Sequence, residues 1–435
     1  MPNRLKVKNW KSSELATDWF KRNKTAYEKD NVAVRTAVQE IVAAVRQRGD
    51  EALLEYTEKF DKTKLTAKDL RVTPAEIKAA YEAVTDEQVA ALRLMKEKLE
   101  FQEKQMLQRQ PAKTSHEGIT VQTALRPLES VGCYVPGGRA VYPSTLVMTA
   151  SPAKVAGVPR VVVCSPPSEK GTINPLILVA ADICGVDEVY KVGGVQAVAA
   201  LAYGTQTIKS VRKIVGPGSK YVTEAKAQVS QDVAIDMPAG PSEVLVLADE
   251  TAEAKWVAAD MISQAEHGAD SIAGLMTTSE RLAEEVGVWL GKLAANAERA
   301  EIVAKALATY GFIIICSDAM EMVSLANAFA PEHLEIVTKT PNEIAAKITS
   351  AGLILIGPFS PVALSDYGSG TNHVLPTGGF GYAFSGLSVL DFVRRVSVVE
   401  SSKEGLRKVK PSIKVLTEAE RLPNHYRAVE ARFEP

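Results

Sequence analysis

The sequence predicts an α/β protein built from two Rossmann-like, doubly wound modules with parallel sheets, together with a helical N-terminal segment and a C-terminal tail. Two observations lead to this prediction. From about residue 130 onward, short apolar runs alternate with helical segments, which is typical of right-handed βαβ units. The 435 residues also exceed a single average domain, since domains of about 150 residues are usual.

The first hundred residues are predicted to be helical. Apolar residues recur at helical spacing over 32–48, and a second helix is expected over 51–60. Thr73-Pro74-Ala75-Glu76 is a helix start, because it places proline at the first helical position and an acid in the first turn. We expect the helix that follows to run towards Gln108, with a break near Thr85-Asp86.

Two series of strands alternate with helices after this segment. The first series of expected strands covers 132–135, 160–164, 188–192, 213–215 and 233–235. The helices expected between them cover 144–156, 174–184, 195–203 and 220–229. The second series of strands covers 243–248, 272–277, 312–316, 334–337 and 353–356, with helices starting near residues 252, 280, 319 and 342. Each series is long enough to form one doubly wound module.

Grouping these elements divides the chain into four parts. We expect an N-terminal helical arm over 1–28 and a first α/β domain formed by 29–130 and 243–384. Residues 131–242 form the second α/β domain, and the join lies near Met237-Pro238-Ala239-Gly240-Pro241. Residues 385–435 are polar, with few periodic features, and are expected to form a tail that docks on another surface.

The composition excludes several classes of protein. With 51 basic and 52 acidic residues, the net charge of −1 provides no global field for nucleic acid or an anionic membrane. No stretch reaches 18 uncharged apolar residues, and the first twenty residues contain no apolar signal segment. The four cysteines lie far apart without a C-x-x-C, so we interpret them as buried thiols of a cytoplasmic protein.

Four of the five histidines lie among carboxylates, amides and glycines. Gln264 and His267 are spaced i, i+3 and therefore share the C-terminal face of a predicted helix. This spacing fits a metal pair, but it equally fits a histidine that faces the helix dipole. His333 follows Glu332, and a carboxylate beside an imidazole can supply a general base near working pH. A solvated turn is the alternative for this pair.

The other two histidines lie in a loop and in the tail. His373 belongs to a glycine-rich loop that also contains Asp366 and Asn372, and such loops form ligand sites at strand ends. His425 lies in the tail, where its surroundings indicate no role. Imidazoles with one carboxylate and one amide suit zinc or a similar divalent ion. No H-E-x-x-H is present, and His333-Leu334-Glu335 lacks the P-C-x-x-C that a nucleobase deaminase requires.

Three glycine pairs follow or close predicted strands, at 132–138, 193–194 and 216–218. Glycine at such turns lets backbone amides approach a phosphate at a helix N-terminus. No G-x-G-x-x-G is present, and tight βα turns need glycine in any case. The residues by themselves therefore indicate a two-module α/β enzyme and leave both a metal and a dinucleotide open.

Six separated motifs in a fixed order resemble the histidinol dehydrogenase family over nearly the whole chain. They are GDEALLEY at 49–56, YVPGG at 134–138, DMPAGPSE at 236–243, QAEHG at 264–268, PEHLE at 331–335 and SGTNHVLPT at 369–377. The resemblance implies oxidation of L-histidinol to L-histidine, through the aldehyde and its hydrate, with two NAD+ consumed in sequence. Domain 29–130 with 243–384 would then be the zinc and substrate side, and 131–242 the NAD side.

The resemblance also implies the residues of the site. One zinc ion per subunit is held by Gln264, His267 and Asp366, and by His425 from the neighbouring subunit of a homodimer with shared active sites. His333 is the base that takes the hydroxyl proton, and Glu332 activates water against the aldehyde. The remaining substrate contacts, besides these zinc ligands and His333, are Ser242, His373 and Glu420, the last delivered by the tail.

The implied NAD contacts are Tyr134, Gln196 and Ser219. The family commonly has asparagine where this chain has Ser219, and serine reaches less far towards a phosphate or ribose oxygen. Three other functions compete with histidinol oxidation: a paralogous zinc and NAD dehydrogenase acting on another small alcohol, a zinc hydrolase in which Glu332 activates metal-bound water, and a binding module without turnover. NAD dependence separates the hydrolase from the dehydrogenases, and turnover separates the binding module from all of them.

Overall fold

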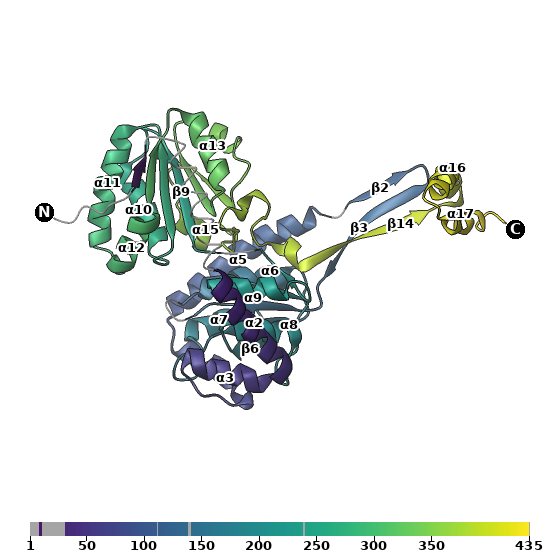
Figure 1. Cartoon of the computed structure of the whole chain (residues 1–435), viewed down its shortest axis with the longest axis horizontal. Coiled ribbons are helices and arrows are strands. Elements are labelled where there is room, and N and C mark those ends of the chain that lie inside the picture. The colour runs from purple at the N-terminus through teal and green to yellow at the C-terminus, as the bar shows by residue number, and fades with distance from the viewer. Residues whose placement is uncertain (1–7, 11–30, 111, 138–140, 238–239, 435) are drawn as a thin grey trace.

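The computed structural model describes residues 8–10, 31–110, 112–137, 141–237 and 240–434, which form two sheet-based domains and a projecting arm (Figure 1). The first domain is built on a six-stranded sheet with all pairings parallel. Its strand order is β1 (Lys8–Trp10), β11 (Phe312–Ile315), β10 (Ile272–Thr277), β9 (Glu243–Ala248), β12 (His333–Val337) and β13 (Leu353–Ile356).

Helices cover both faces of this sheet. One face packs against α10 (Ala254–Ala265), α11 (Glu280–Ala295) and α12 (Ala300–Tyr310). The other face packs against α13 (Ala319–Phe329) and α14 (Pro341–Ala345). The strands are mainly apolar because both of their faces are buried: Val244 and Val246 face the first helix layer, while Leu245 and Leu247 face the second. The short helix α15 (Val362–Tyr367) follows β13.

The second domain is built on a five-stranded parallel sheet. Its order is β6 (Glu188–Lys191), β5 (Val161–Ser165), β4 (Val131–Tyr134), β7 (Lys213–Val215) and β8 (Ala234–Ile235). One face is covered by α4 (Pro74–Glu82), α5 (Asp86–Gln108), α6 (Pro143–Val155) and α7 (Pro175–Ile183). The other is covered by α2 (Asn31–Arg48), α3 (Asp50–Asp61), α8 (Gly194–Tyr203) and α9 (Lys220–Val229).

A third, antiparallel sheet forms the arm, which we define as residues 113–127 and 393–434. Its strands are ordered β14 (Val393–Ser401), β3 (Ile119–Pro127) and β2 (Lys113–His116). At its tip lie α16 (Lys403–Ala419), which begins where the Ser402 side chain accepts from the Gly405 amide, and α17 (Pro423–Glu430). Figure 1 shows the arm extending away from both domains, with α16 and α17 at its far end.

The structure confirms the predicted α/β class and every strand of both predicted series, with shifts of one residue at some ends. The predicted break between two helices is also confirmed, because Thr85 caps α5 by accepting from the Gln88 amide. All four cysteines are buried and unpaired, as expected. Within the described ranges, no helix is long and apolar enough to cross a bilayer.

Three expectations are wrong. Helices α2 to α5 pack on the five-stranded sheet, not with residues 243–384, because apolar stripes such as Val34, Val38 and Val45 join the core beneath α8 and α9. Residues 8–10, expected in a helical arm, form an edge strand beside β11, and the rest of 1–28 lies outside the described residues. The tail 385–435, in which no strand or helix was predicted, contains β14 and two helices.

Candidate active site

Two neighbouring strands bring the predicted catalytic pair to one edge of the six-stranded sheet. His333 is the first residue of β12 and pairs in register with Val244 of β9, so Glu332 and His333 lie beside Glu243. All strands of this sheet are parallel, and the cluster therefore sits at their amino ends. This location departs from the usual one, since ligands of open α/β sheets generally bind beyond the carboxyl ends.

The carboxylates of Glu332 and Glu243 each accept a hydrogen bond from the backbone amide of the other residue. The Glu332 Oε2 atom accepts from the Glu243 amide at 2.8 Å, and the Glu243 Oε2 atom accepts from the Glu332 amide at 3.2 Å. Glu243 Oε1 also accepts from the Gly378 amide at 3.0 Å. Burial, together with the nearby Glu332 charge, raises the pKa of Glu243 to about 8. Glu243 is not among the predicted site residues, although a glutamate at the start of an otherwise apolar strand can indicate one.

His333 is oriented by this pair of glutamates. Its Nδ1 lies 3.2 Å from the Glu243 carbonyl oxygen and 3.6 Å from Glu332 Oε2, so Nδ1 carries the proton and donates it there. Its Nε2 is buried, makes no hydrogen bond within the described part of the chain, and lies 3.7 Å from Asp366 Oδ1. Burial lowers the pKa of His333, but the charges of Glu332 and Asp366 outweigh it and raise the pKa overall. The geometry therefore leaves a basic Nε2 lone pair in a closed site.

His373 reaches the same cluster from the glycine-rich loop. Its Nδ1 lies 3.3 Å from the Asp366 carbonyl oxygen and 3.9 Å from Asp366 Oδ1. Its Nε2 lies 3.5 Å from the hydroxyl of Thr145, on α6 of the other domain. The neighbouring Asn372 donates to the Met148 carbonyl oxygen at 2.7 Å. Burial lowers the pKa of His373 and outweighs the charge of Asp366, which acts in the opposite direction. The site thus lies where the two domains meet.

Gln264 is the last but one residue of α10 and is 2% exposed, whereas His267 lies just beyond the helix end and is half-buried. Asp260 of α10 and Glu335 of β12 lie close enough for each to influence the pKa of the other. Burial raises the pKa of Asp260 to about 6. Neither carboxyl is among the predicted site residues, because only the fold brings residue 260 beside residue 335.

The first residue of α15 is hydrogen-bonded to Glu335 of β12. The Glu335 Oε1 atom accepts from the Val362 amide at 2.8 Å, at the start of α15. Asp366 lies near the other end of this helix.

The donor chemistry fits a divalent metal. Asp366 Oδ1 is buried and accepts no hydrogen bond from the residues that the structure describes, and an unpaired buried carboxylate oxygen is costly unless a cation or donor meets it. Carboxylate, imidazole and amide are ligands that zinc accepts. Across the described ranges, no group of three His, Cys, Asp or Glu residues gathers as a metal centre. Ser242 stands directly before β9 at the same sheet edge, half-buried.

The predicted tail residues do not reach this cluster within one chain. Glu420 ends α16 and His425 lies in α17, both exposed near the tip of the arm (Figure 1). The structure of a single chain therefore brings together Glu332, His333, Asp366 and His373, places Gln264, His267 and Ser242 at the ends of adjoining elements, and leaves Glu420 and His425 apart.

A cavity of about 670 Å³ lies at the carboxyl edge of the five-stranded sheet. Its lining includes Tyr134 at the end of β4, Pro166 after β5 and Gly194 at the start of α8. The Tyr134 hydroxyl accepts from the Gly194 amide at 3.1 Å. Gln196, in the first turn of α8, is 1% exposed and does not line the cavity, and its Oε1 has no partner among the described residues. The cavity therefore meets a helix N-terminus, which favours anionic ligand groups, and an unsatisfied amide oxygen lies directly behind Gly194.

The third predicted cofactor contact lies next to this cavity but does not line it. Ser219 is exposed at the start of α9, and it follows a loop in which a Cβ at Gly216 would lie 2.2 Å from the Tyr134 carbonyl oxygen. A Cβ at Gly218 would lie 2.5 Å from the Val222 side chain. Glycine is therefore required at Gly216 by Tyr134 and at Gly218 by Val222, and Ser219 lies just beyond these contacts.

Helix α6 contacts both the cavity and the cluster formed by Glu332, His333, Asp366 and His373, which we propose below as the catalytic cluster. Val141, two residues before α6 begins, lines the cavity, and Thr145 in the first turn contacts His373. Four residues span at most about 14 Å. A ligand in the cavity could therefore extend to the cluster.

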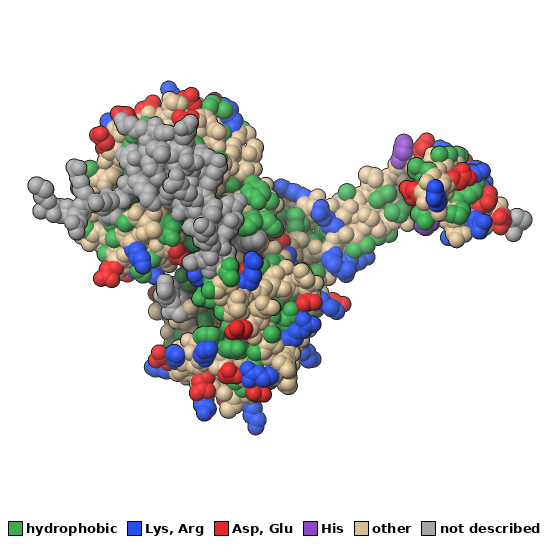
Figure 2. All heavy atoms as spheres, viewed as in Figure 1, with side chains coloured by type: hydrophobic (Ala, Val, Ile, Leu, Met, Phe, Trp, Pro, Cys, Tyr) green, Lys and Arg blue, Asp and Glu red, His purple; other side chains and the backbone are tan. Residues whose placement is uncertain are grey.

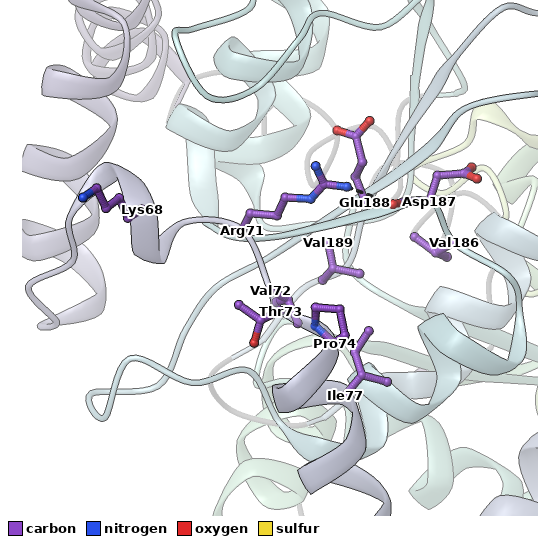
Figure 3. A pocket seen from close by; sticks show the side chains of 10 residues that line it. All are labelled: Lys68, Arg71, Val72, Thr73, Pro74, Ile77, Val186, Asp187, Glu188 and Val189. Carbon is purple, nitrogen blue, oxygen red and sulfur yellow. Dashed lines mark hydrogen bonds between the residues drawn. The ribbon is translucent and has the colours of Figure 1, made fainter.

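A second hollow, of about 500 Å³, lies at the outer edge of the same sheet (Figure 3). Lys68, Arg71 and Asp187 are among its lining side chains, and Arg71 donates to the Asp187 carbonyl oxygen at 3.4 Å. None of the predicted site residues lines it.

Comparisons with known proteins agree over the whole chain. The model of the histidinol dehydrogenase family matches residues 24–433. The chain is 47% identical to histidinol dehydrogenase of Methanocaldococcus jannaschii over 413 residues, covering 95% of this chain and 94% of that protein. It is 48% identical to histidinol dehydrogenase of Caldanaerobacter subterraneus, covering 95% of both chains. The crystal structure of histidinol dehydrogenase from Elizabethkingia anophelis superposes with a TM-score of 0.89 at 39% identity and covers 92% of both chains.

Proposed function

This chain belongs to the histidinol dehydrogenase family, and on that premise we propose that it oxidises L-histidinol to L-histidine through histidinal, with zinc and two NAD+. The reaction ends histidine biosynthesis and takes place in the cytoplasm. The observation that carries the proposal is the buried His333 Nε2, which has no partner within the described chain and lies 3.7 Å from Asp366 Oδ1. A base without a partner beside a carboxylate without a partner suits a site that receives both a metal and an alcohol.

His333 and Glu332 carry out different proton transfers in the proposed reaction. The Nδ1 proton of His333 stays hydrogen-bonded to the Glu243 carbonyl oxygen. Nε2 therefore accepts the hydroxyl proton of the alcohol as the alcohol carbon gives up hydride. Glu332 removes a proton from the water that adds to the aldehyde, and His333 accepts the hydroxyl proton of the resulting hydrate in the second oxidation. Both groups are buried, which keeps the aldehyde from bulk water between the two steps.

The remaining polar residues hold substrate, zinc and cofactor in place. When bound, zinc supplies a Lewis acid for the imidazole and amino nitrogens of the substrate, and NAD+ supplies the hydride acceptor. Gln264, His267 and Asp366 would hold the metal, together with His425 from a second subunit. Ser242, His373 and Glu420 would contact the substrate.

The NAD+ site that we propose is the cavity at the end of β4. Its position beside α6 would bring the nicotinamide towards His373 and His333. Tyr134 and Gln196 supply a phenol and an amide, and the N-terminus of α8 supplies free amides for the pyrophosphate. Ser219 would contact the cofactor from outside the cavity.

We propose a homodimer in which the arm of each chain completes the active site of the other. Leu416 and Leu422, at the tip of the arm, are 60% and 44% exposed, and Figure 2 shows hydrophobic side chains on the arm surface. Near Asp366, the ring of Tyr367 is 60% exposed. Burying these apolar surfaces against each other would stabilise the dimer and carry Glu420 and His425 to the zinc site.

The first experiment is the stoichiometry of NADH formed by the zinc-loaded protein from limiting L-histidinol. Two NADH per histidinol is the expected result and establishes the double oxidation. One NADH per histidinol would replace the proposal with a simple alcohol dehydrogenase. Turnover of a substrate without NAD+ would point to a zinc hydrolase instead. No NADH from histidinol, but NADH from another small alcohol, would identify a paralogue.

A further inference from the structure

Asp61 is the last residue of α3 and lines the cavity that also contains Tyr134 and Gly194. Its carboxylate makes no hydrogen bond or ion pair with the residues that the structure describes, and its Oδ2 is sealed from solvent. The adjacent Lys62 does not neutralise it, because the Lys62 ammonium donates to the Lys59 carbonyl oxygen. A half-buried carboxylate without partners loses part of its hydration and gains nothing in return. It is therefore a candidate contact for a ligand that donates hydrogen bonds.

The charge of this group is the first indication of the ligand. Burial raises the pKa of Asp61 to about 6, so the carboxylate is still mainly ionised at pH 7 to 8. It also contributes to raising the pKa of Tyr134, which places its charge near the phenol of the cofactor cavity. An ionised carboxylate accepts hydrogen bonds from hydroxyls and repels phosphates.

Its place in the fold is the second indication. Helices α3 and α8 cover one face of the five-stranded sheet, and α6 covers the other. The catalytic cluster lies on the α6 side, through Thr145 and His373. A dinucleotide that directs its nicotinamide to that side turns its other half towards α3, where Asp61 stands.

We propose that Asp61 accepts the two hydroxyls of the adenosine ribose of NAD+ and thereby excludes NADP+. This inference rests on the proposed NAD+ site. A vicinal diol can donate to both oxygens of one carboxylate, whereas a 2′-phosphate removes one donor and adds like charge. Doubly wound dehydrogenases commonly place such an acid about 20 residues after a glycine-rich turn. Here the acid comes from a helix that precedes the sheet in sequence, so no such motif contains it.

The test measures binding of NAD+ and NADP+ separately by isothermal titration calorimetry on the full-length zinc-loaded protein. Asp61→Asn keeps the shape but loses one acceptor and the charge. We expect NAD+ to bind about 10-fold more weakly, since one hydrogen bond to a charged group is worth about 1.5 kcal/mol or more. We expect NADP+ to bind more tightly, so that the preference for NAD+ falls at least about 10-fold.

Glu58→Gln is the matched control, because Glu58 lies one turn earlier on α3, is exposed and does not line the cavity. It should leave both affinities unchanged. Asp61→Ser, which makes room for a 2′-phosphate, should shift the preference further towards NADP+. Thermal unfolding verifies that each variant folds, and Asp61→Asn should be at least as stable as the parent because it removes an unpaired buried charge.

The outcomes separate this inference from the function it rests on. If the parent binds NAD+ but Asp61→Asn retains its preference, the role of Asp61 is overturned while the dehydrogenase proposal stands. If Asp61→Asn weakens the binding of NAD+ and NADP+ equally, the role of Asp61 is overturned too, since Asp61 would then only shape the cavity. If the parent binds neither nucleotide, the NAD+ site itself is wrong and the inference falls with it.

Discussion

Glu332 and Glu243 each accept a hydrogen bond from the other's backbone amide, across the first residues of two paired strands. This reciprocal arrangement fixes the Glu332 carboxylate at the sheet edge without using a cation. It also brings two carboxyl groups together in a buried site, where both cannot be ionised cheaply. Burial and the nearby Glu332 charge therefore raise the pKa of Glu243 to about 8.

Replacing Glu243 by glutamine should make stability less dependent on pH. The folded-state pKa of Glu243 lies above its unfolded value, so its contribution to the free energy of unfolding is fully present below about pH 4.5 and is lost as the pH rises through about 8. Glu243→Gln should therefore gain stability relative to the parent between pH 6 and pH 9, by at least about 1 kcal/mol. Thermal unfolding across this range measures the effect. The exposed Glu284→Gln on α11 should show no such trend, and an equal trend in both variants would refute the assignment.

Removing the two predicted catalytic groups should affect different steps. His333→Ala should lower the rate of both oxidations by about 10²–10⁴-fold, because it removes the base that accepts the hydroxyl proton. Glu332→Gln should slow hydration of the aldehyde, so that NADH per histidinol falls from two towards one. Rapid-mixing measurements of NADH separate the two phases. Zinc content should stay unchanged in His333→Ala, and loss of zinc would indicate that His333 is a ligand instead.

Two inactive variants should restore activity when mixed, if the arm completes the neighbouring site. His425→Ala should lose zinc and turnover, and His333→Ala should lose turnover alone. In a mixed dimer, the site that has His333 also receives an intact His425 from the other chain. Random exchange makes about half of the dimers mixed, each with one intact site, so activity should return to about a quarter of the parent level. No recovery after verified subunit exchange would contradict shared sites.

A buried ion pair supports the loop beside the proposed cofactor cavity. Lys226 and Asp236 are 3% and 0% exposed and form a salt bridge. Lys226 also donates to the Gly216 carbonyl oxygen, and Asp236 accepts from the Gly216 amide. Lys226→Met would leave an uncompensated buried carboxylate, so we expect a loss of about 3–5 kcal/mol in the free energy of unfolding.

Chemical denaturation measures this loss, and adding Asp236→Asn should recover part of it because the unpaired charge is then removed. Lys209→Met, at an exposed position of the same domain, is the control and should stay within about 0.5 kcal/mol. A Lys226→Met protein as stable as the parent would show that the pair contributes little. In the variants that fold, NAD+ affinity should also fall, since the Gly216 loop packs on Tyr134.

The regular elements follow from the sequence because their signals are local. The strand at 243–248 and the helix at 220–229 have the predicted bounds, since an unbroken apolar run and an amphipathic pattern each depend on a few neighbouring residues. The motifs around Glu332-His333 and Asn372-His373 likewise contain residues that the fold brings into one cluster. The antiparallel sheet of the arm was missed, because β3 and β14 pair across more than 260 intervening residues and neither is stable alone.

The sequence by itself determined the order of the elements, the family resemblance and the residue types needed for the chemistry. Only the tertiary structure decided that α2 to α5 cover the five-stranded sheet, that Glu243 and Glu332 accept from each other's amides, and that Asp61 lines the cavity at the end of β4. It also placed the proposed catalytic cluster at the amino edge of one sheet and the cavity at the carboxyl edge of the other. The physical reason is that a periodic apolar stripe shows that one face of an element is buried, but does not show which other element covers that face. Contacts between distant residues are settled by packing all the elements at once.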